Sequence, residues 1–331
     1  MKKLKIAIQN NELGQRGGIA TYSNRLEKYL NGTKIKVGNQ EIDVEAKQFV
    51  SRIRNGPDVI SIQYEPGMLP PQALQSIIQR YSQPVVVTAH HMGILPQFYP
   101  LMDGIVVHSK NQLEGYDEPW NYTVIPHPAL VFENKDKKEL RKKYGLPEDK
   151  KILGTAGFIV GTGKELPMII EKILRKMKDD EFLFCSTSFW KGGDFGHTEI
   201  IMKKVKELGK EDNFRIDTDF VPEEVLNEKM QCCDLLFAWN NLNAPGSNSG
   251  IAMDMLGARR KLIVKDSNHY GFVGSIKGVA KGRQGVDEFV TDIFKLFRSN
   301  RLDKDIPDPI PYSWETMTKK YAEYFYEILG E

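Results

Sequence analysis

Short apolar runs alternate with stretches in which apolar residues recur every three to four positions. In the first part of the chain the runs are rich in Val and Ile, are bounded by turn residues and carry their polar residues at the C-terminal end. Such runs predict parallel strands that are buried on both faces of a sheet. They are KIAIQN (5–10), DVISIQYE (58–65), PVVVTAHH (84–91), GIVVHSK (104–110) and YTVIPHP (122–128).

Two helical patterns lie between these runs. The segment 17–32, GGIATYSNRLEKYLNG, predicts a glycine turn that opens a helix, and the helix stops at Gly32. The segment 70–82, PPQALQSIIQRYS, begins with proline, which suits the first turn of a helix, and continues with a period of 3.6 residues. Strands and helices therefore alternate, as in a sheet built from parallel crossovers.

After a charged helical segment (139–150) the alternation starts again. Its strand patterns are KILGTAGF (151–158), EFLFCSTSF (181–189), FRIDTDFV (214–221), DLLFAWN (234–240) and KLIVKD (261–266). Two series of this kind predict an α/β protein with two doubly wound, Rossmann-like domains and a central cleft, and ligands of such sheets bind beyond the carboxyl ends of the strands. The last segment, 312–329, is amphipathic, and Trp314, Met317, Tyr321 and Tyr324 share one helical face.

Composition narrows the class of protein. The chain has 331 residues, and its 46 basic and 44 acidic residues give a net charge of +2, so no overall field indicates nucleic acid. Three cysteines without metal-ligand spacing indicate a reducing compartment. The N-terminus does not fit a signal peptide, and no apolar window approaches the roughly 18 residues of a spanning helix. We expect a cytoplasmic protein. The basic segment 134–145 is interpreted as a solvated helix face, with contact to the inner membrane surface or an acceptor as the alternative.

A glycine-rich turn precedes Lys164 in GFIVGTGKELPMII (157–170). This is not a P-loop, because Phe158 takes the place of the first glycine and Glu165 that of the hydroxyl residue. A cation and free backbone N–H groups at a helix N-terminus nevertheless suit an anion.

Four segments together resemble the GT-B glycosyltransferases, and within them the retaining family four. GGIATYSNRL is similar to the family's glycine turn, VVVTAHHMG to its Thr-x-His segment, LRKKYGLPEDKKILGTAGFIVGTGK to its interdomain passage, and YSWETMTKKYAEYFYEIL to its C-terminal helix. The resemblance covers nearly the whole chain. It implies an acceptor domain (1–132), a nucleotide-sugar donor domain (133–311) and a helix (312–331) that returns to the first domain.

The resemblance also implies roles for single residues. Gly17 and Gly18 would lie near the donor diphosphate, and Lys164 would bind it. His90 would lie beside the reacting sugar and donate hydrogen bonds. His90 and Lys164 are thus the candidate catalytic residues. Since a sugar–nucleotide bond leaves negative charge on the β-phosphate when it breaks, a fixed cation lowers the barrier.

The segment APGSNSGIAMDMLGARR (244–260) has turn and N-cap residues that open an apolar helix. Ser249, Gly250 and Ile251 are candidates for binding the diphosphate. Family members carry two glutamates here, seven residues apart. Asp254 matches the second, which contacts the ribose. The first, which contacts the donor sugar, has no counterpart, because Gly246 or Ser247 stands there. Asn240, Asn243, Ser247 and Asn248 are the candidates to hold the donor sugar instead.

Other polar residues have weaker assignments. Tyr64 and Glu65, at a strand end, are candidates for acceptor contact. His108 and His127 occupy similar strand ends, where structural capping is favoured. The Asp217–Asp219 triplet imitates a metal motif of another glycosyltransferase fold, but a strand edge is the preferred interpretation. No metal ligands and no cofactor are predicted.

The predicted function is retaining, metal-independent transfer of a hexose from a UDP- or GDP-linked sugar to a hydroxyl of a glycan, a lipid-linked sugar or another acceptor. Two alternatives stay open. One is a catalytically silent GT-B subunit that binds a partner, motivated by the missing glutamate. The other is a nucleotide-sugar epimerase, which would need cleft carboxylates that the sequence does not locate.

Overall fold

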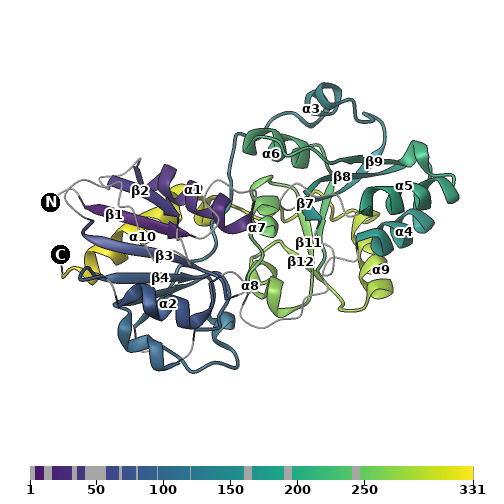
Figure 1. The fold of residues 1–331 in the computed structure, drawn as a ribbon. Helices are drawn as coiled ribbons and strands as arrows, with labels where there is room; N and C mark the ends of the chain where they lie inside the picture. Colours follow the sequence, from purple (N-terminus) through teal and green to yellow (C-terminus); the bar gives the residue numbers. More distant parts are fainter. Residues whose placement is uncertain are drawn as a thin grey trace. The chain divides into compact units, whose positions relative to one another are not determined.

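The computed structural model describes residues 4–10, 17–31, 36–41, 57–66, 69–79, 81–94, 96–119, 121–159, 166–189, 196–240 and 247–330. Lys164 and Asn243 of the predicted site lie outside these ranges. The chain forms two compact units (Figure 1). Unit 1 comprises Met1–His127, Ala244–Asn248 and Trp314–Glu331, and unit 2 comprises Pro128–Asn243 and Ser249–Ser313.

Unit 1 is built on a six-stranded, all-parallel sheet with the order β2-β1-β3-β4-β5-β6. Its strands are β1 Lys5–Asn10, β2 Lys36–Glu41, β3 Val59–Tyr64, β4 Val85–Ala89, β5 Gly104–Val107 and β6 Tyr122–Val124. All of these follow predicted runs except β2. The β2 sequence, KVGNQE, lacks an apolar run, and the strand pairs only with β1 at the edge of the sheet.

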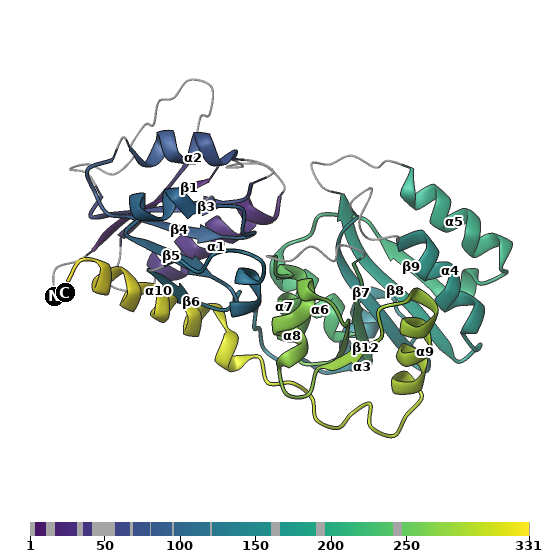
Figure 2. The same cartoon turned by 90° about the horizontal axis from the view of Figure 1, so that it is seen from below.

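Helices cover both faces of this sheet. Figure 2 shows α2 (Pro71–Ile78) on one face and α10 (Trp314–Ile328) on the other, where α10 packs against α1 (Gly18–Asn31). Short 3-10 turns, η1 (Pro96–Leu101) and η2 (Lys110–Leu113), follow β4 and β5. The predicted face of α10 is confirmed, because Trp314, Met317, Tyr321 and Tyr324 are all buried.

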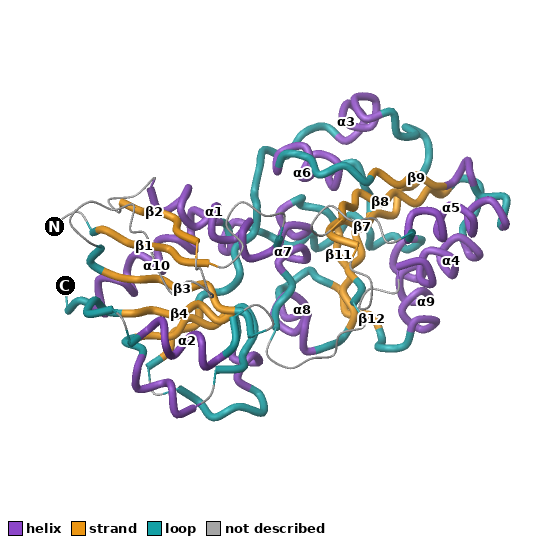
Figure 3. The backbone as a smooth tube through the Cα atoms, viewed as in Figure 1, coloured by secondary structure: helices purple, strands orange, loops and turns teal. Residues whose placement is uncertain are grey.

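Unit 2 has a second six-stranded parallel sheet, with the order β12-β11-β10-β7-β8-β9 (Figure 3, orange strands). The strand order reverses between β7 and β10, and ligands of such sheets bind beyond the carboxyl ends of the strands at this point. The strands are β7 Lys151–Ile159, β8 Glu181–Phe189, β9 Phe214–Asp217, β10 Leu235–Ala238, β11 Lys261–Lys265 and β12 Ala280–Gly282. The sequence pattern missed only β12, a three-residue edge strand.

Two apolar clusters hold the helices of unit 2 to its sheet. One joins the sheet to α4, α5 and α9, and the other joins it to α3, α6, α7 and α8. The helices are α3 Lys137–Tyr144, α4 Leu166–Lys176, α5 His197–Glu207, α6 Glu223–Gln231, α7 Gly250–Gly257, α8 Gly271–Ser275 and α9 Val286–Phe297. The short turns are η4 Glu211–Asn213, η5 Asn268–Tyr270 and η6 Ile310–Tyr312. In the part of the chain that is described, no helix combines the length and the apolar character needed to span a bilayer.

Candidate functional site

One face of the unit 1 sheet carries buried polar side chains. Residues of the apolar cluster around α2 alternate along β3 and β4 with Ser61, Gln63 and Thr88, which therefore point to the face covered by α1 and α10. None of these three side chains has solvent exposure. Because burial of a polar group is costly unless it is hydrogen-bonded, a polar layer of this kind is expected to be organised by specific bonds.

His90 is hydrogen-bonded to this polar layer through Gln63. Its backbone N–H donates to the carbonyl of Tyr64 at 2.9 Å, and its ring Nε2 lies 3.0 Å from Oε1 of Gln63. The Gln63 Nε2 group in turn donates to Ser61 Oγ at 3.3 Å. The neighbouring strand β3 thus holds both the backbone and the ring of the predicted active-site histidine.

Three histidines and a tyrosine form one ring cluster beside this network. The Tyr22 ring lies 4.6 Å from His90, 5.4 Å from His108 and 5.0 Å from His127, measured between ring centroids. His108 is 5.3 Å from His90 and 5.2 Å from His127. His108 Nδ1 donates to the Ile125 carbonyl at 2.9 Å, which is a strand-end contact of the kind that capping predicts. The cluster itself was not anticipated from the sequence.

The C-terminal helix closes this cluster. The hydroxyls of Tyr22 and Tyr321 are 2.7 Å apart, and the ring of buried Trp314 lies 5.0 Å from that of Tyr22. Burial, together with the neighbouring Tyr321, raises the pKa of Tyr22 well above its ordinary value. Tyr22 therefore stays a neutral hydrogen-bonding group at any pH near neutrality.

Two histidines of the cluster, His90 and His108, have pKa values that keep them neutral near pH 7. Burial, with His108 and His127 as further causes, lowers the pKa of His90 well below its ordinary value. Burial lowers the pKa of His108 to about 4, although its bond to the Ile125 carbonyl opposes the shift. Near neutral pH, His90 is therefore expected to bind a ligand as a neutral hydrogen-bonding group.

Acid pH is expected to destabilise unit 1 through these groups. A histidine whose pKa is lower in the folded than in the unfolded state contributes stability that is complete above about pH 6.5 and is lost as the pH falls towards the folded value. For His108 the loss by pH 4 is on the order of 3 kcal/mol. Urea titrations at pH 7 and 4.5 measure it. The His108→Asn variant, which removes the titrating ring, should show a weaker pH dependence than wild type. Equal wild-type stability at both pH values would contradict the expectation.

Two further places in unit 1 hold predicted residues, the start of α1 with Gly17 and Gly18 and the end of β3 with Tyr64. The Gly17 carbonyl accepts from Thr21 N at 3.0 Å, and Gly18 is the exposed first residue of α1, where an added Cβ would meet nothing within 4 Å. Tyr64 is fully buried, and its hydroxyl donates to the Gly93 carbonyl at 3.3 Å, so its side chain presents no surface to an acceptor.

Ser247 and Asn248 group with unit 1 rather than with the helix that they precede. Ser247 forms an isolated antiparallel bridge with His91, and Asn248 Nδ2 donates to Ser109 Oγ at 3.1 Å. The sequence pattern assigned both residues, with Ser249, to one helix opening. Only Ser249 caps that helix.

In unit 2 the N-terminus of α7 is built as predicted. The Ser249 hydroxyl accepts from Ala252 N at 3.3 Å. At the far end of α7, Gly257 packs so closely on the preceding chain that an added Cβ would lie 1.8 Å from the Leu130 carbonyl oxygen. These contacts fix the helix end that is available to an anion.

A small hollow of about 20 Å³ lies at the reversal of strand order between β7 and β10. Residues from the ends of three strands, from α4, from η5 and from α7 line it. They are Thr155, Ala156, Gly157, Phe158, Leu166, Thr187, Phe237, Ala238, Trp239, Ile251, Met255 and Tyr270. Ile251, a predicted diphosphate residue, is among them. The hollow stands at the position in the fold where a nucleotide is expected.

Two aromatic side chains of this hollow make further contacts. Phe158 stacks on half-exposed Phe220, with ring centroids 6.2 Å apart. The ammonium of buried Lys265 lies over the Trp239 ring, 4.6 Å from the ring centroid. The same ammonium donates to the Asn240 carbonyl at 3.3 Å. Neither Trp239 nor Lys265 belongs to a motif recognised in the sequence, although both stand at the C-terminal ends of strands, the position that marks candidate ligand contacts in such sheets.

Asp254, the predicted ribose ligand, lies in the second turn of α7 and is buried. The Asp217 carboxylate is bonded by Arg215 at 2.7 Å and by Lys229 at 2.6 Å. Burial opposes the shift, but these hydrogen bonds hold the pKa of Asp217 below its usual value. Asp217 is thus engaged by cations at a strand edge. Among the described residues, no group of three or more His, Cys, Asp or Glu side chains is arranged to hold a metal ion.

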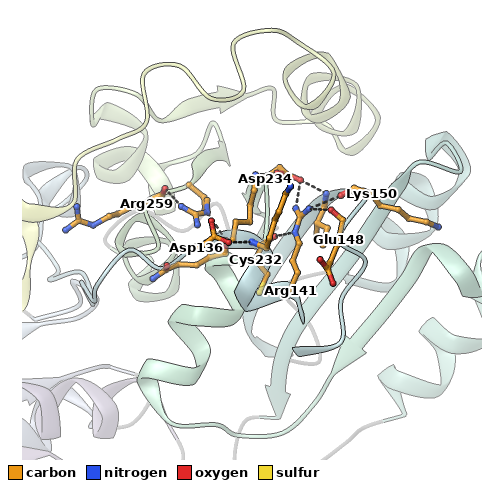
Figure 4. Close-up of polar contacts among 12 residues, drawn as sticks. Asp136, Arg141, Glu148, Lys150, Cys232, Asp234 and Arg259 are labelled. Atoms are coloured by element: carbon orange, nitrogen blue, oxygen red, sulfur yellow. Dashed lines mark hydrogen bonds and ion pairs between the residues drawn. The ribbon is translucent and has the colours of Figure 1, made fainter. Parts of the chain in front are cut away.

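A larger cavity of about 710 Å³ lies in unit 2 at the amino ends of β10 and β11, where Asp234 and Lys261 help to line it. Asp234 and Lys137 of its lining also belong to an ion-pair network with Arg141 (Figure 4). Asp234 accepts from Arg141 Nη2 at 2.7 Å and pairs with Lys137. This cavity is at the wrong edge of the sheet for a nucleotide.

Solved structures share this architecture over the whole chain. No family model and no curated protein matches the sequence. A glycosyltransferase from Rickettsia africae ESF-5 matches with a TM-score of 0.73 at 12% identity, over 99% of each chain. Sucrose-phosphate synthase from Thermosynechococcus elongatus has the same TM-score and identity over 99% of this chain and 100% of its own. The Anabaena protein HepE, solved with UDP and glucose, has a TM-score of 0.72 at 12% identity over 98% and 100%.

This chain has the GT-B fold. The predicted fold class is confirmed. At 12% identity the likeness carries the architecture and not the chemistry of the site.

Proposed function

We propose that the protein transfers a sugar from a nucleotide sugar to an acceptor hydroxyl, with retention of configuration and without a metal ion. The observation that carries the proposal is the capped α7 N-terminus next to a hollow at the strand-order reversal of unit 2. UDP and UDP-glucose are bound in structures of HepE, which has the same fold. A UDP- or GDP-linked hexose is the proposed donor, and a glycan or lipid-linked sugar the proposed acceptor.

The proposed mechanism is front-face displacement. The acceptor oxygen forms a bond to the anomeric carbon as the bond from that carbon to the β-phosphate oxygen breaks, and the leaving phosphate takes the acceptor's proton. Backbone N–H groups at Ser249, Gly250 and Ile251, with Lys164, stabilise the charge that develops on the diphosphate. Asp254 accepts hydrogen bonds from the ribose, and Asn240 and Asn243 take the place of the missing glutamate at the sugar.

Nucleotide binding tests the proposal most directly. Calorimetry with UDP, GDP and ADP should find one that binds, since the phosphate elements do not depend on the missing glutamate. A donor panel should then show transfer with weak or altered sugar discrimination, because charged hydrogen bonds of about 1.5–3 kcal/mol each are absent. Transfer should persist in EDTA. If none of the three nucleotides binds, the silent-subunit alternative replaces this proposal, and activity that EDTA abolishes and manganese restores would overturn metal independence.

The Lys164→Ala variant is expected to raise the barrier to transfer by about 2–4 kcal/mol, because one preorganised charge is lost at the departing phosphate. Steady-state kinetics with the best donor measures the change. Lys172→Ala serves as the control, because Lys172 belongs to the following helix and pairs with exposed Asp287. Kinetics of Lys164→Ala within threefold of wild type would remove Lys164 from the site.

A further inference from the structure

The side-chain amide of Gln63 contacts the ring of His90. The amide oxygen of Gln63 only accepts hydrogen bonds and its nitrogen only donates them. The nitrogen donates to Ser61 Oγ at 3.3 Å, and the oxygen faces His90 Nε2 at 3.0 Å. With the amide in this orientation, only a protonated Nε2 can bond its oxygen, so the one ring proton of a neutral His90 belongs on Nε2. The other ring nitrogen, Nδ1, then has a lone pair.

The contacts around the ring leave Nδ1 as the nitrogen through which His90 can bind a ligand. Gln63 is fully buried, whereas His90 keeps part of its surface exposed. Among the described residues, no hydrogen-bond partner of Nδ1 is found. The titratable groups against the ring are Tyr22 of α1, His108 after β5 and His127 after β6. Tyr321 of α10 joins them through the Tyr22 hydroxyl.

We propose that Gln63 is a positioning residue that accepts a hydrogen bond from the only ring N–H of His90, at Nε2, so that Nδ1 accepts a hydrogen bond from a sugar hydroxyl. This reverses the role that the family resemblance implies, in which the histidine donates. The inference about turnover rests on the proposed function. The inference about the proton does not.

His108 supplies an internal control. Its Nδ1 donates to the Ile125 carbonyl, and its Nε2 is buried without a partner among the described residues. The two neighbouring histidines are therefore expected to be opposite tautomers, His90 protonated on Nε2 and His108 on Nδ1.

Long-range ¹H–¹⁵N NMR on protein labelled at its six histidines tests this directly, with His90→Asn and His108→Asn for assignment. For His90 the expected spectrum shows an exchange-protected proton on Nε2 and an unprotonated Nδ1. For His108 it shows a proton on Nδ1 and an unprotonated Nε2. A proton on His90 Nδ1 overturns the proposal, whether or not the protein turns over a sugar nucleotide.

Two variants test the positioning role. Gln63→Leu, which is apolar and similar in size, should speed exchange of the His90 ring proton and lower kcat about tenfold, the effect of one lost hydrogen bond. Nucleoside diphosphate affinity should stay within twofold. Gln63→Glu should keep the protected proton and move His90 protonation, and the acid limb of the kcat profile, upward by about one pH unit or more, since a carboxylate favours the imidazolium.

Unchanged proton exchange in Gln63→Leu, or no shift of His90 protonation in Gln63→Glu, would overturn the role of Gln63. If no donor of the panel is turned over, the proposed function fails, and the exchange and protonation measurements still decide the tautomer.

Discussion

Replacement of Gly257 by alanine is expected to destabilise unit 2 by about 4–5 kcal/mol, the extreme of the range for single substitutions. The new Cβ would lie 1.8 Å from the carbonyl oxygen and 2.7 Å from the carbonyl carbon of Leu130. Neither is the movable end of a side chain, so the backbone of α7 or of the Leu130 segment must shift. Chemical denaturation measures the loss, and hydrogen exchange shows that it is confined to unit 2.

Gly18→Ala is the matched control for this substitution. Gly18 is also helical, but an added Cβ would meet nothing within 4 Å, so its stability should stay within about 0.5 kcal/mol of wild type. Since α7 carries the Ser249 cap, Gly257→Ala should also weaken nucleotide binding. A Gly257→Ala protein within about 1 kcal/mol of wild type would mean that α7 and the Leu130 segment are not in contact as described.

Arg141→Met is expected to cost about 3–5 kcal/mol, as for other buried ion pairs that lose one partner. The Arg141 guanidinium donates to Asp234 Oδ2 at 2.7 Å, and its backbone acceptors are the carbonyls of Cys232 and Lys150, at 2.9 and 3.1 Å (Figure 4). Its removal leaves the Cys232 carbonyl oxygen without this donor in a buried place, and the part-buried Lys150 carbonyl oxygen loses the same donor. The Asp234 carboxylate keeps Lys137 and the N–H of Ile152 but loses its buried partner.

The exposed pair Arg283–Asp292 is the control for Arg141→Met. The side chain of Arg141 is 5% exposed and that of Arg283 is 59% exposed, although both make short bonds to a carboxylate. Solvent screening limits an exposed pair to about 0–1 kcal/mol, so Arg283→Met should be close to neutral. Urea denaturation compares the two variants under one condition. Equal effects would show that burial does not govern the value of the Arg141 pair.

The candidate site depends on the close packing of Gly257 and on the buried Arg141–Asp234 ion pair. The Gly257 contact positions the helix that carries Ser249, and the Arg141–Asp234 pair fastens the start of β7, whose other end lines the hollow. Both lie away from the proposed ligand atoms. Variants at these positions should therefore lose stability and nucleotide affinity together, whereas Lys164→Ala should lose turnover without losing stability.

The sequence by itself determined the succession of strands and helices and the buried face of α10. Each of these rests on a local pattern, either a continuous Val and Ile run or apolar residues at helical spacing, and burial of such residues depends little on which element covers them. The resemblance of four segments was enough to predict the GT-B fold. The two strands that the pattern missed, β2 and β12, are edge strands, and β2 has a polar sequence that becomes a strand only by pairing with β1.

Only the tertiary structure decided which polar residues meet. Gln63, His90, His108 and His127 follow or end different strands, and Tyr22 comes from a helix, so no spacing along the chain relates them. For the same reason the sequence placed Ser247 with Ser249 on one helix opening, whereas Ser247 bridges His91 in unit 1. Local periodicity reports whether a side chain is buried. Its partners, and through them its protonation and chemistry, are set by contacts between segments that are far apart in sequence.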